Sequence, residues 1–183
     1  VYLAGTYGQA KRVAWEYVKE FTKKLPGAKA NEAELRVDIP RPHLEDKVRL
    51  LLLGAENPDS LRGIYIDGCV LDEFGVCDPS VWGEVIRPAL ADREGWAIFI
   101  GTPKGQNHFY NLYNKARTIK KDWYVALYRA SETGVIPDTE LEAAKAEMNE
   151  EEYEQEFECS WTAANVGAYY QKAIAKLEKG NRI

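Results

Sequence analysis

Gly68-Cys69-Val70-Leu71-Asp72-Glu73 is the stretch of sequence that decides the fold. A short apolar segment runs directly into two carboxylates, which is typical of a buried strand that ends at a polar site. A nucleotide hydrolase needs one carboxylate to hold Mg²⁺ through its water shell and a second group to activate the attacking water. Adjacent residues at a strand end can divide these roles because their side chains point to opposite sides. A structural strand ending in a solvated acidic turn has the same pattern, so this motif alone leaves both interpretations open.

A second strand with a polar ending follows along the chain. Trp96 to Ile100 is predicted as a short buried strand, and Gly101-Thr102-Pro103-Lys104-Gly105 comes directly after it. The hydroxyl of Thr102 is then placed to sense a γ-phosphate or the water held by Glu73. The alternative is an ordinary strand-to-helix loop, in which Thr102 caps the helix that Pro103 opens.

The remaining pattern alternates strands with helices, which predicts an α/β fold with a mainly parallel sheet and helices on both faces. Glu34–Ile39 and Lys47–Leu53 are predicted as an added antiparallel hairpin with a long connection. Other predicted elements are a strand end at 1–4, a helix at 10–21 with an apolar face, a helix opened by Pro79 behind the cap Asp78, a helix carrying Phe109, a strand at 123–128 and an acidic helix at 137–157. The predicted inward face of the first helix comprises Ala10, Val13, Ala14, Tyr17, Val18 and Phe21.

Arg62 lies in the loop Ser60-Leu61-Arg62-Gly63, ten residues before Asp72. An arginine in such a loop can reach a phosphate, its own or a neighbour's, and neutralise transition-state charge. The alternative is a surface arginine packed over the sheet edge. No GxxxxGK[ST] motif occurs in the 183 residues. A nucleotide-hydrolase interpretation therefore places the phosphate-binding loop before Val1, and it predicts that this chain alone is inactive.

Composition limits the function without naming it. The net charge of −5 argues against a free-standing DNA-binding module, although a DNA motor can concentrate a few basic side chains on one surface. The longest aliphatic run is Leu50–Leu53, far too short to span a membrane, and no basic-then-apolar segment opens the given sequence, so no signal peptide is expected. The three cysteines lack zinc-site spacing and are expected to be free thiols, which favours a cytoplasmic location.

With these motifs in place, the chain resembles the ATPase domain of phage terminase large subunits, a P-loop NTPase-like fold. The resemblance covers roughly residues 1–160 in consistent order. The motifs that carry it are Thr6-Tyr7-Gly8-Gln9-Ala10-Lys11 with Trp15, Gly54-Ala55-Glu56-Asn57-Pro58-Asp59-Ser60-Leu61-Arg62-Gly63, Leu71-Asp72-Glu73, Trp82, Arg87-Pro88-Ala89-Leu90-Ala91-Asp92, Gly101-Thr102-Pro103-Lys104-Gly105 and Asn107-His108-Phe109-Tyr110. The chain departs from the pattern at Gly5, where the family often has proline, and in a longer loop around Arg41 and His43.

The resemblance implies ATP and Mg²⁺ as cofactors and assigns four residues. Asp72 would be the Walker B metal-site aspartate, Glu73 the catalytic glutamate, and Thr102 part of the coupling motif. Arg62 would act as an arginine finger on the adjacent subunit of a ring. The implied partners are double-stranded DNA, further copies of the chain, the portal protein and the terminase small subunit, in the cytoplasm of the host cell and with no membrane.

The family also implies a domain division. Residues 1–160 would form the ATPase domain, incomplete at its N-terminus, and residues 161–183 a linker or the start of a following nuclease domain. The run Gly167-Ala168-Tyr169-Tyr170 resembles the approach to that nuclease, but its acidic cluster is not in the sequence, so no nuclease activity is assigned. Two other interpretations remain open at this point: a degenerate, non-catalytic ATPase-fold interaction module, and a related helicase-like ATPase.

Overall fold

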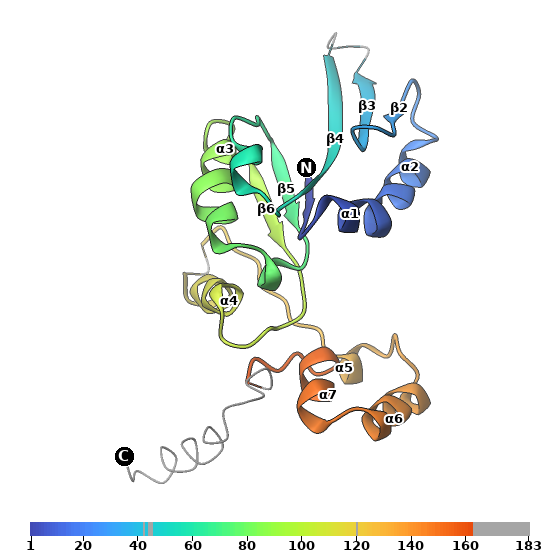
Figure 1. Cartoon of the computed structure of the whole chain (residues 1–183), viewed down its shortest axis with the longest axis vertical. Coiled ribbons are helices and arrows are strands. Elements are labelled where there is room, and N and C mark those ends of the chain that lie inside the picture. The colour runs from blue at the N-terminus through green and yellow to red at the C-terminus, as the bar shows by residue number, and fades with distance from the viewer. Residues whose placement is uncertain (42, 44–45, 120, 163–183) are drawn as a thin grey trace. The chain divides into compact units, whose positions relative to one another are not determined.

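The computed structural model describes residues 1–41, 43, 46–119 and 121–162. The chain forms two compact units, Val1–Gly101 and Thr102–Ile183 (Figure 1). The strands are β1 (Tyr2–Ala4), β2 (Lys29–Asn31), β3 (Arg36–Arg41), β4 (Asp46–Gly54), β5 (Gly68–Leu71) and β6 (Trp96–Phe99), all in the first unit. None of the helices within the described ranges has both the length and the apolar character needed to cross a membrane.

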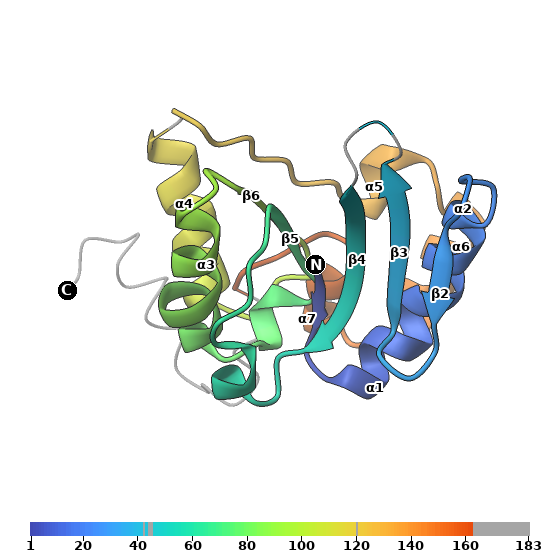
Figure 2. The same cartoon turned by 90° about the horizontal axis from the view of Figure 1, so that it is seen from above.

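The six strands form one sheet in the order β2-β3-β4-β1-β5-β6. The pairs β4–β1, β1–β5 and β5–β6 are parallel, whereas β2–β3 and β3–β4 are antiparallel. Figure 2 shows β2, β3 and β4 side by side as a ribbon that continues the parallel part of the sheet. Both the mainly parallel sheet and the added antiparallel hairpin are therefore confirmed. The connection of the hairpin is shorter than predicted, because β3 and β4 stay paired as far as Arg41 and Asp46.

One face of the sheet is covered by the first helical segment. It comprises α1 (Tyr7–Ala10), the π-helical stretch η1 (Lys11–Trp15) and α2 (Glu16–Thr22). Trp15 is almost fully buried in a core formed with strand residues such as Val37 and Leu52. The indole N–H of Trp15 donates to the Glu32 carboxylate at 2.6 Å, which satisfies the buried polar atom of the ring.

The other face is covered by the segment that follows β5. It contains the short helix η3 (Phe74–Val76) and then η4 (Val81–Ile86) and α3 (Arg87–Ala91). Phe99 of β6 contacts the rings of Phe74 and Trp82, with centroid separations of 4.9 and 4.7 Å. The side chain of Asp78 accepts the backbone N–H of Ser80 at 2.8 Å, as the predicted cap requires. Helices therefore lie on both faces of the sheet.

The buried face of the first helix differs from the predicted one. Val13, Tyr17 and Phe21 are 48%, 64% and 76% exposed, whereas Trp15 and Thr22 are buried. The prediction assumed a regular α-helix, but the π-helical stretch Lys11–Trp15 adds one residue to a turn. All later positions are rotated by this extra residue, so Trp15 takes the inward position that regular spacing gives to Ala14.

β6 is a strand, as predicted, but it is not buried. Trp96, Ile98 and Ile100 are 43% to 56% exposed, and β6 lies at the end of the strand order. The register pairs Ile98 with Val70 and Val70 with Tyr2, so these exposed side chains lie on the same face as the first helical segment. That segment packs against β3 and β4, and the side chains on this face of β6 are about half exposed.

The second unit is helical in its described part. Its helices are α4 (His108–Ile119), α5 (Ala130–Thr133), α6 (Asp138–Glu147) and α7 (Glu150–Glu156). Trp161 packs against Phe109, Tyr110 and Tyr113 of α4, with ring centroids 5.4 to 5.5 Å apart.

Two predictions for this unit are wrong. Residues 123–128 pair with no strand, and the alternating side chains Tyr124 and Tyr128 are 85% and 69% exposed. The predicted helix at 137–157 is interrupted at Met148 and Asn149, which are both extended. The side chain of Asn149 then caps α7 by accepting the N–H of Glu152 at 2.8 Å. Residues 163–183, including Gly167–Tyr170, lie outside the described residues, so the predicted boundary at 160/161 stays a prediction.

Candidate active site

Asp72 directly follows β5 at the carboxyl end of the parallel strands. Its backbone N–H donates to the carbonyl of Leu3 at 2.8 Å and continues the pairing of β5 with β1. The carboxylate is held from two sides. Oδ1 accepts the backbone N–H of Glu73 at 3.0 Å, and Oδ2 accepts a short hydrogen bond from the hydroxyl of Tyr2.

Tyr2 is the site residue that the sequence did not reveal. Its partial burial, followed by the hydrogen bond to Asp72, raises the pKa of Tyr2 far above the usual value. The phenol therefore keeps its proton and acts as a donor to the carboxylate. The contact between Tyr2 and Asp72 follows from the strand register. Tyr2 lies opposite Val70, and Asp72, two residues after Val70, is on the same face.

Glu73 sits in a strained backbone conformation next to Asp72. Its φ of 50° and ψ of 43° are left-handed, which costs a non-glycine residue about 1–2 kcal/mol. The residue after β6 holds the turn in place, because the N–H of Phe74 donates to the carbonyl of Ile100 at 3.0 Å. Strain that the surroundings hold in place is common at functional sites, where it fixes a side chain for chemistry.

Gly101 lets the chain after β6 approach this turn. Its φ is +151°, and a Cβ added there would lie 3.1 Å from the Cα of Glu73 and 3.3 Å from the N of Phe74. Both neighbours are backbone atoms that cannot rotate away, so any side chain at Gly101 would push the Asp72–Glu73 turn. Thr102 is the next residue and begins the second unit. The coupling role of Thr102 stays a prediction.

Cys77 supports the turn through its thiol. The sulfur lies 3.9 Å from the carbonyl oxygen of Asp72 and 3.7 Å from that of Glu73, within reach for weak S–H hydrogen bonds. Burial, then the charges of Asp72 and Glu73, raise the pKa of Cys77 to about 11, so this thiol stays neutral. All three cysteines are free, as expected.

Arg62 lies in the loop before β5 and not in the Asp72–Glu73 turn. It ends the short helix η2 (Pro58–Leu61), and its guanidinium pairs with Asp59 at 2.8 Å and with Glu84 at 3.4 Å. The side chain is 54% exposed and borders a hollow of about 280 Å³. Asp72 and Glu73 are sequence neighbours at the end of β5, whereas Arg62 follows η2, where its side chain is half exposed and paired with Asp59 and Glu84.

Glu56 joins two of the motifs that the sequence singled out. Its carboxylate accepts the backbone N–H of Tyr7 at 3.0 and 3.1 Å, and therefore sits at the N-terminal end of α1. An anion there is stabilised by the unpaired N–H groups and the dipole of the helix. Gly54 permits this contact, because a Cβ at that position would lie 1.8 Å from the Glu56 carboxylate and 2.2 Å from the Tyr7 nitrogen.

The donor set at the strand ends suits a magnesium ion bound largely through water. Among residues that the structure describes, no group of three or more His, Cys, Asp or Glu side chains could hold a metal by itself. Magnesium commonly needs only one or two carboxylates, since phosphates and waters complete its shell. Each oxygen of Asp72 accepts one hydrogen bond and retains a second lone pair, so the residues present fit that kind of site.

Comparison with known proteins agrees with this architecture. The terminase large subunits of Thermus phage G20c and Thermus virus P23-45 are each 49% identical to the chain over 59 residues. This segment is 32% of the chain and only 12% of those proteins, so the match covers a small part of their length.

Solved structures show the same fold over most of the chain. The large terminase ATPase domain of Thermus phage P74-26 is 26% identical with a TM-score of 0.60, covering 88% of this chain and 75% of that one. The large terminase of a second thermophilic bacteriophage has a TM-score of 0.70 at 16% identity and covers 88% and 40% of the two chains. Another structure of that second phage's terminase, at 15% identity and a TM-score of 0.69, is a complex with ADP.

The widest match is to a family rather than to a single protein. A family model described as terminase large subunit, T4likevirus-type, N-terminal matches residues 1–176. This span includes every described residue of the sheet and of the Asp72–Glu73 turn. The chain therefore belongs to the terminase large subunit family, T4likevirus-type, N-terminal.

Proposed function

We propose that this chain is part of the ATP-hydrolysing motor of a terminase large subunit, which moves double-stranded DNA into a viral procapsid. The observation that carries the proposal is the turn after β5, where two adjacent carboxylates follow a parallel strand and Glu73 is held in a left-handed conformation. The carboxyl ends of parallel strands are where ligands bind in such sheets.

The two carboxylates divide the chemistry between them. Asp72, fixed by Tyr2 and by the N–H of Glu73, would hold a magnesium ion through its water shell. The ion would supply neutralisation of charge on the β- and γ-phosphates. Glu73, the carboxylate next to Asp72, would orient the attacking water and accept its proton. Its left-handed backbone conformation fixes the direction in which its side chain leaves the turn.

The nucleotide site is completed by residues that the 183-residue sequence does not contain. A loop of the GxxxxGK[ST] type would cradle the phosphates, and the open face of β6 supports such an addition. Parallel strands are ordinarily buried on both faces, yet Trp96, Ile98 and Ile100 are about half exposed. An added strand and helix beside β6 would cover these side chains.

Under the same proposal, the chain acts in a ring of copies on the portal protein, with the terminase small subunit, in the cytoplasm of the host cell. Arg62 would complete the ATP site of the adjacent subunit, and Thr102 would relay hydrolysis to DNA movement. The exposed guanidinium of Arg62, beside Gly63, is consistent with a residue that reaches another molecule.

The test uses the complete protein with Glu73→Gln, Asp72→Asn and the matched surface change Glu20→Gln on α2. Glu73→Gln keeps the size of the side chain and removes the charge that accepts a proton, so ATP binding should remain while hydrolysis falls by about 10²–10⁴-fold. Asp72→Asn should raise the Mg²⁺ concentration needed for activity, and Glu20→Gln should change neither. ATP turnover by Glu73→Gln near the wild-type rate would remove the assigned role.

A further inference from the structure

One face of the β2–β3–β4 ribbon carries a concentration of positive charge. The register places Lys29, Asp38 and Arg49 directly opposite one another across the three strands, so their side chains share one face. Arg36 and Lys47 lie on the same face, because each is two residues from a member of this row. We call Lys29, Arg36, Asp38, Lys47 and Arg49 the basic face.

The two faces of the ribbon have different chemistry. Val37 and Leu50 point to the opposite side, where they pack with Trp15. That side is the hydrophobic core beneath the first helical segment. The basic face points away from this core and comprises four cations and one carboxylate, Asp38, while a second carboxylate, Glu34, pairs with Arg36 beside it. The whole chain has a net charge of −5, so this face opposes the average charge of the protein.

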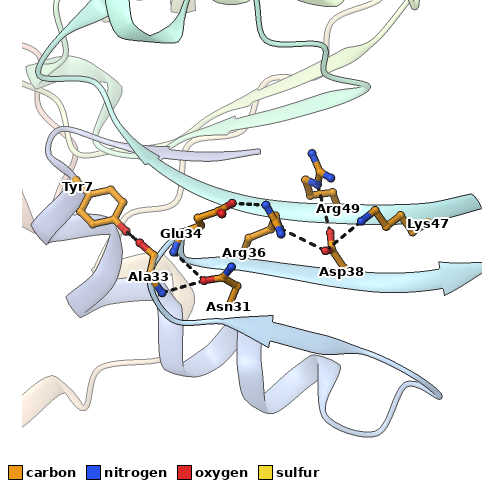
Figure 3. Close-up of polar contacts among 8 residues, drawn as sticks. All are labelled: Tyr7, Asn31, Ala33, Glu34, Arg36, Asp38, Lys47 and Arg49. Atoms are coloured by element: carbon orange, nitrogen blue, oxygen red, sulfur yellow. Dashed lines mark hydrogen bonds and ion pairs between the residues drawn. The ribbon is translucent and has the colours of Figure 1, made fainter.

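Asp38 positions the cations without neutralising them all. Its carboxylate lies 3.3 Å from Lys47 Nζ, 3.2 Å from Arg49 Nε and 3.4 Å from Arg36 Nε (Figure 3). Partial burial opposes ionisation of Asp38, but hydrogen bonds from Lys47 and Arg49 hold its pKa below the usual value. One negative charge is thus shared by three cations, and Arg36 has a second partner in Glu34.

The outer cations remain accessible to a ligand. The side chains of Lys47 and Arg49 are each 50% exposed, although both contact Asp38. Lys29 is exposed and, within the described ranges, forms no ion pair. Lys47 and Arg49 are thus fixed by Asp38 while half of each side chain remains accessible to a ligand.

The composition of this face favours nucleic acid over protein as its ligand. Protein–protein interfaces are enriched in aromatic residues and depleted in lysine, whereas protein–DNA interfaces are polar and strongly positive. The basic face has no aromatic side chain. Of the exposed residues that the register places on this side of the ribbon, Lys29, Lys47 and Arg49 are cationic and Pro40 is uncharged. Phosphate contacts of this kind carry no base specificity, which suits an enzyme that must move any sequence.

We propose that the basic face, through Lys47 and Arg49 above all, binds the sugar–phosphate backbone of double-stranded DNA. The inference rests on the proposed function, because it assigns the DNA substrate of that motor to a named surface. Asp38 acts as the positioning residue that holds the two cations side by side.

The experiment compares three forms of the complete protein: wild type, Lys47→Gln/Arg49→Gln, and the control Arg12→Gln/Arg93→Gln. The control removes the same charge from exposed positions that lie outside the basic face. Surface ion pairs contribute about 0–1 kcal/mol to stability, so neither variant should unfold, and melting temperatures verify this. Affinity for a fluorescein-labelled duplex of about 30 base pairs is measured by anisotropy from about 50 to 300 mM salt.

Each phosphate contact contributes about 0.9 to the slope of log affinity against log salt concentration. In the Lys47→Gln/Arg49→Gln variant, which loses two contacts, the slope should therefore be shallower by about 1.8. If both proteins bind equally at about 1 M salt, this difference makes the variant bind about 60-fold more weakly than the wild type at about 0.1 M salt. The control should keep the wild-type slope. Basal ATP hydrolysis without DNA should be the same in all three forms.

The outcomes separate this inference from the function on which it rests. A wild-type protein that hydrolyses ATP and binds the duplex, with an unchanged slope in the Lys47→Gln/Arg49→Gln variant, would overturn the basic face alone. Failure of the wild-type protein to bind duplex DNA at any salt concentration would overturn both. Unchanged DNA binding with weaker self-association, measured by sedimentation, would show instead that this face contacts another protein subunit.

Discussion

The hydroxyl of Tyr2 donates a hydrogen bond to the carboxylate of Asp72, across 70 positions of sequence. Tyr2 opens β1 in the middle of the sheet, and Asp72 directly follows the neighbouring strand β5. The second oxygen of Asp72 is fixed by the N–H of Glu73. The carboxylate is thereby held in one orientation by a group from β1 and a group from the turn after β5.

Tyr2→Phe tests whether this orientation matters for binding of the proposed magnesium ion. Removing the hydroxyl leaves the ring and the fold but frees one oxygen of Asp72 to rotate. Loss of a hydrogen bond to a metal-binding side chain commonly costs about 10–100-fold in metal affinity or activity. In the complete protein, the Mg²⁺ concentration for half-maximal ATP hydrolysis should therefore rise by about tenfold. The control Tyr17→Phe changes an exposed hydroxyl on α2 and should have no effect; equal Mg²⁺ dependence in both variants would leave Tyr2 a purely structural role.

Gly101→Ala tests the close approach of the chain to the Asp72–Glu73 turn. The new methyl group would lie 3.1 Å from the Cα of Glu73, so the turn or the residues after β6 must shift. Small displacements of catalytic groups are costly, up to about 10²-fold for 1 Å, so the rate constant for hydrolysis should fall at least about tenfold. Gly83→Ala is the matched control, because nothing lies within 4 Å of the added methyl in its helix. Full activity of Gly101→Ala would show that the turn tolerates movement.

Glu32→Ala tests the polar contact of the buried Trp15. The hydrogen bond from Trp15, and then that from Lys19, lower the pKa of Glu32 in the folded protein. A lowered pKa adds stability above the unfolded value of about 4.3, and this stability is lost as the pH falls through the folded value. The melting temperature of Glu32→Ala should lie below that of the wild type at pH 7, and the gap should narrow below about pH 4. A gap that stays constant with pH would assign the effect to packing instead.

Sequence alone predicted those parts of the fold where local pattern and tertiary structure agree. The strand Gly68–Leu71, the hairpin partners β3 and β4, and the cap at Asp78 are local features with clear residue signals. The break at Asn149 also had such a signal, since Asn149 and Glu152 have the spacing of a capping box, but the acidic helical pattern concealed it.

Other features depend on information that no local pattern contains. The π-helical stretch at Lys11–Trp15 rotates the helix, and Val13 and Tyr17 become exposed although their spacing is regular. The bond from Tyr2 to Asp72 depends on strand register, and the basic face depends on which residues of separate strands lie opposite one another. A net charge of −5 conceals such a face.

The last prediction concerns Arg62, which we expect to act on a neighbouring subunit. Its ion pairs with Asp59 and Glu84 are exposed and weak, so they can be exchanged for a phosphate at little cost. An arginine finger is worth about 10³–10⁵ in rate. Arg62→Ala in the complete protein should thus nearly abolish ATP hydrolysis while ATP affinity and melting temperature stay close to wild type. Arg93→Ala is the matched control, because Arg93 is also half exposed and paired with one carboxylate, Asp67.

A mixing experiment distinguishes action between subunits from action within one. Arg62→Ala subunits retain Glu73, and Glu73→Gln subunits retain Arg62, so each variant alone should be inactive. In mixed rings, some intact Glu73 sites lie beside an intact Arg62, and part of the hydrolysis should return. The recovered rate should depend on the mixing ratio and be greatest when both subunits are abundant. Rings shown by mass spectrometry to contain both subunits, yet without recovery, would exclude action between subunits and leave Arg62 a role in its own chain.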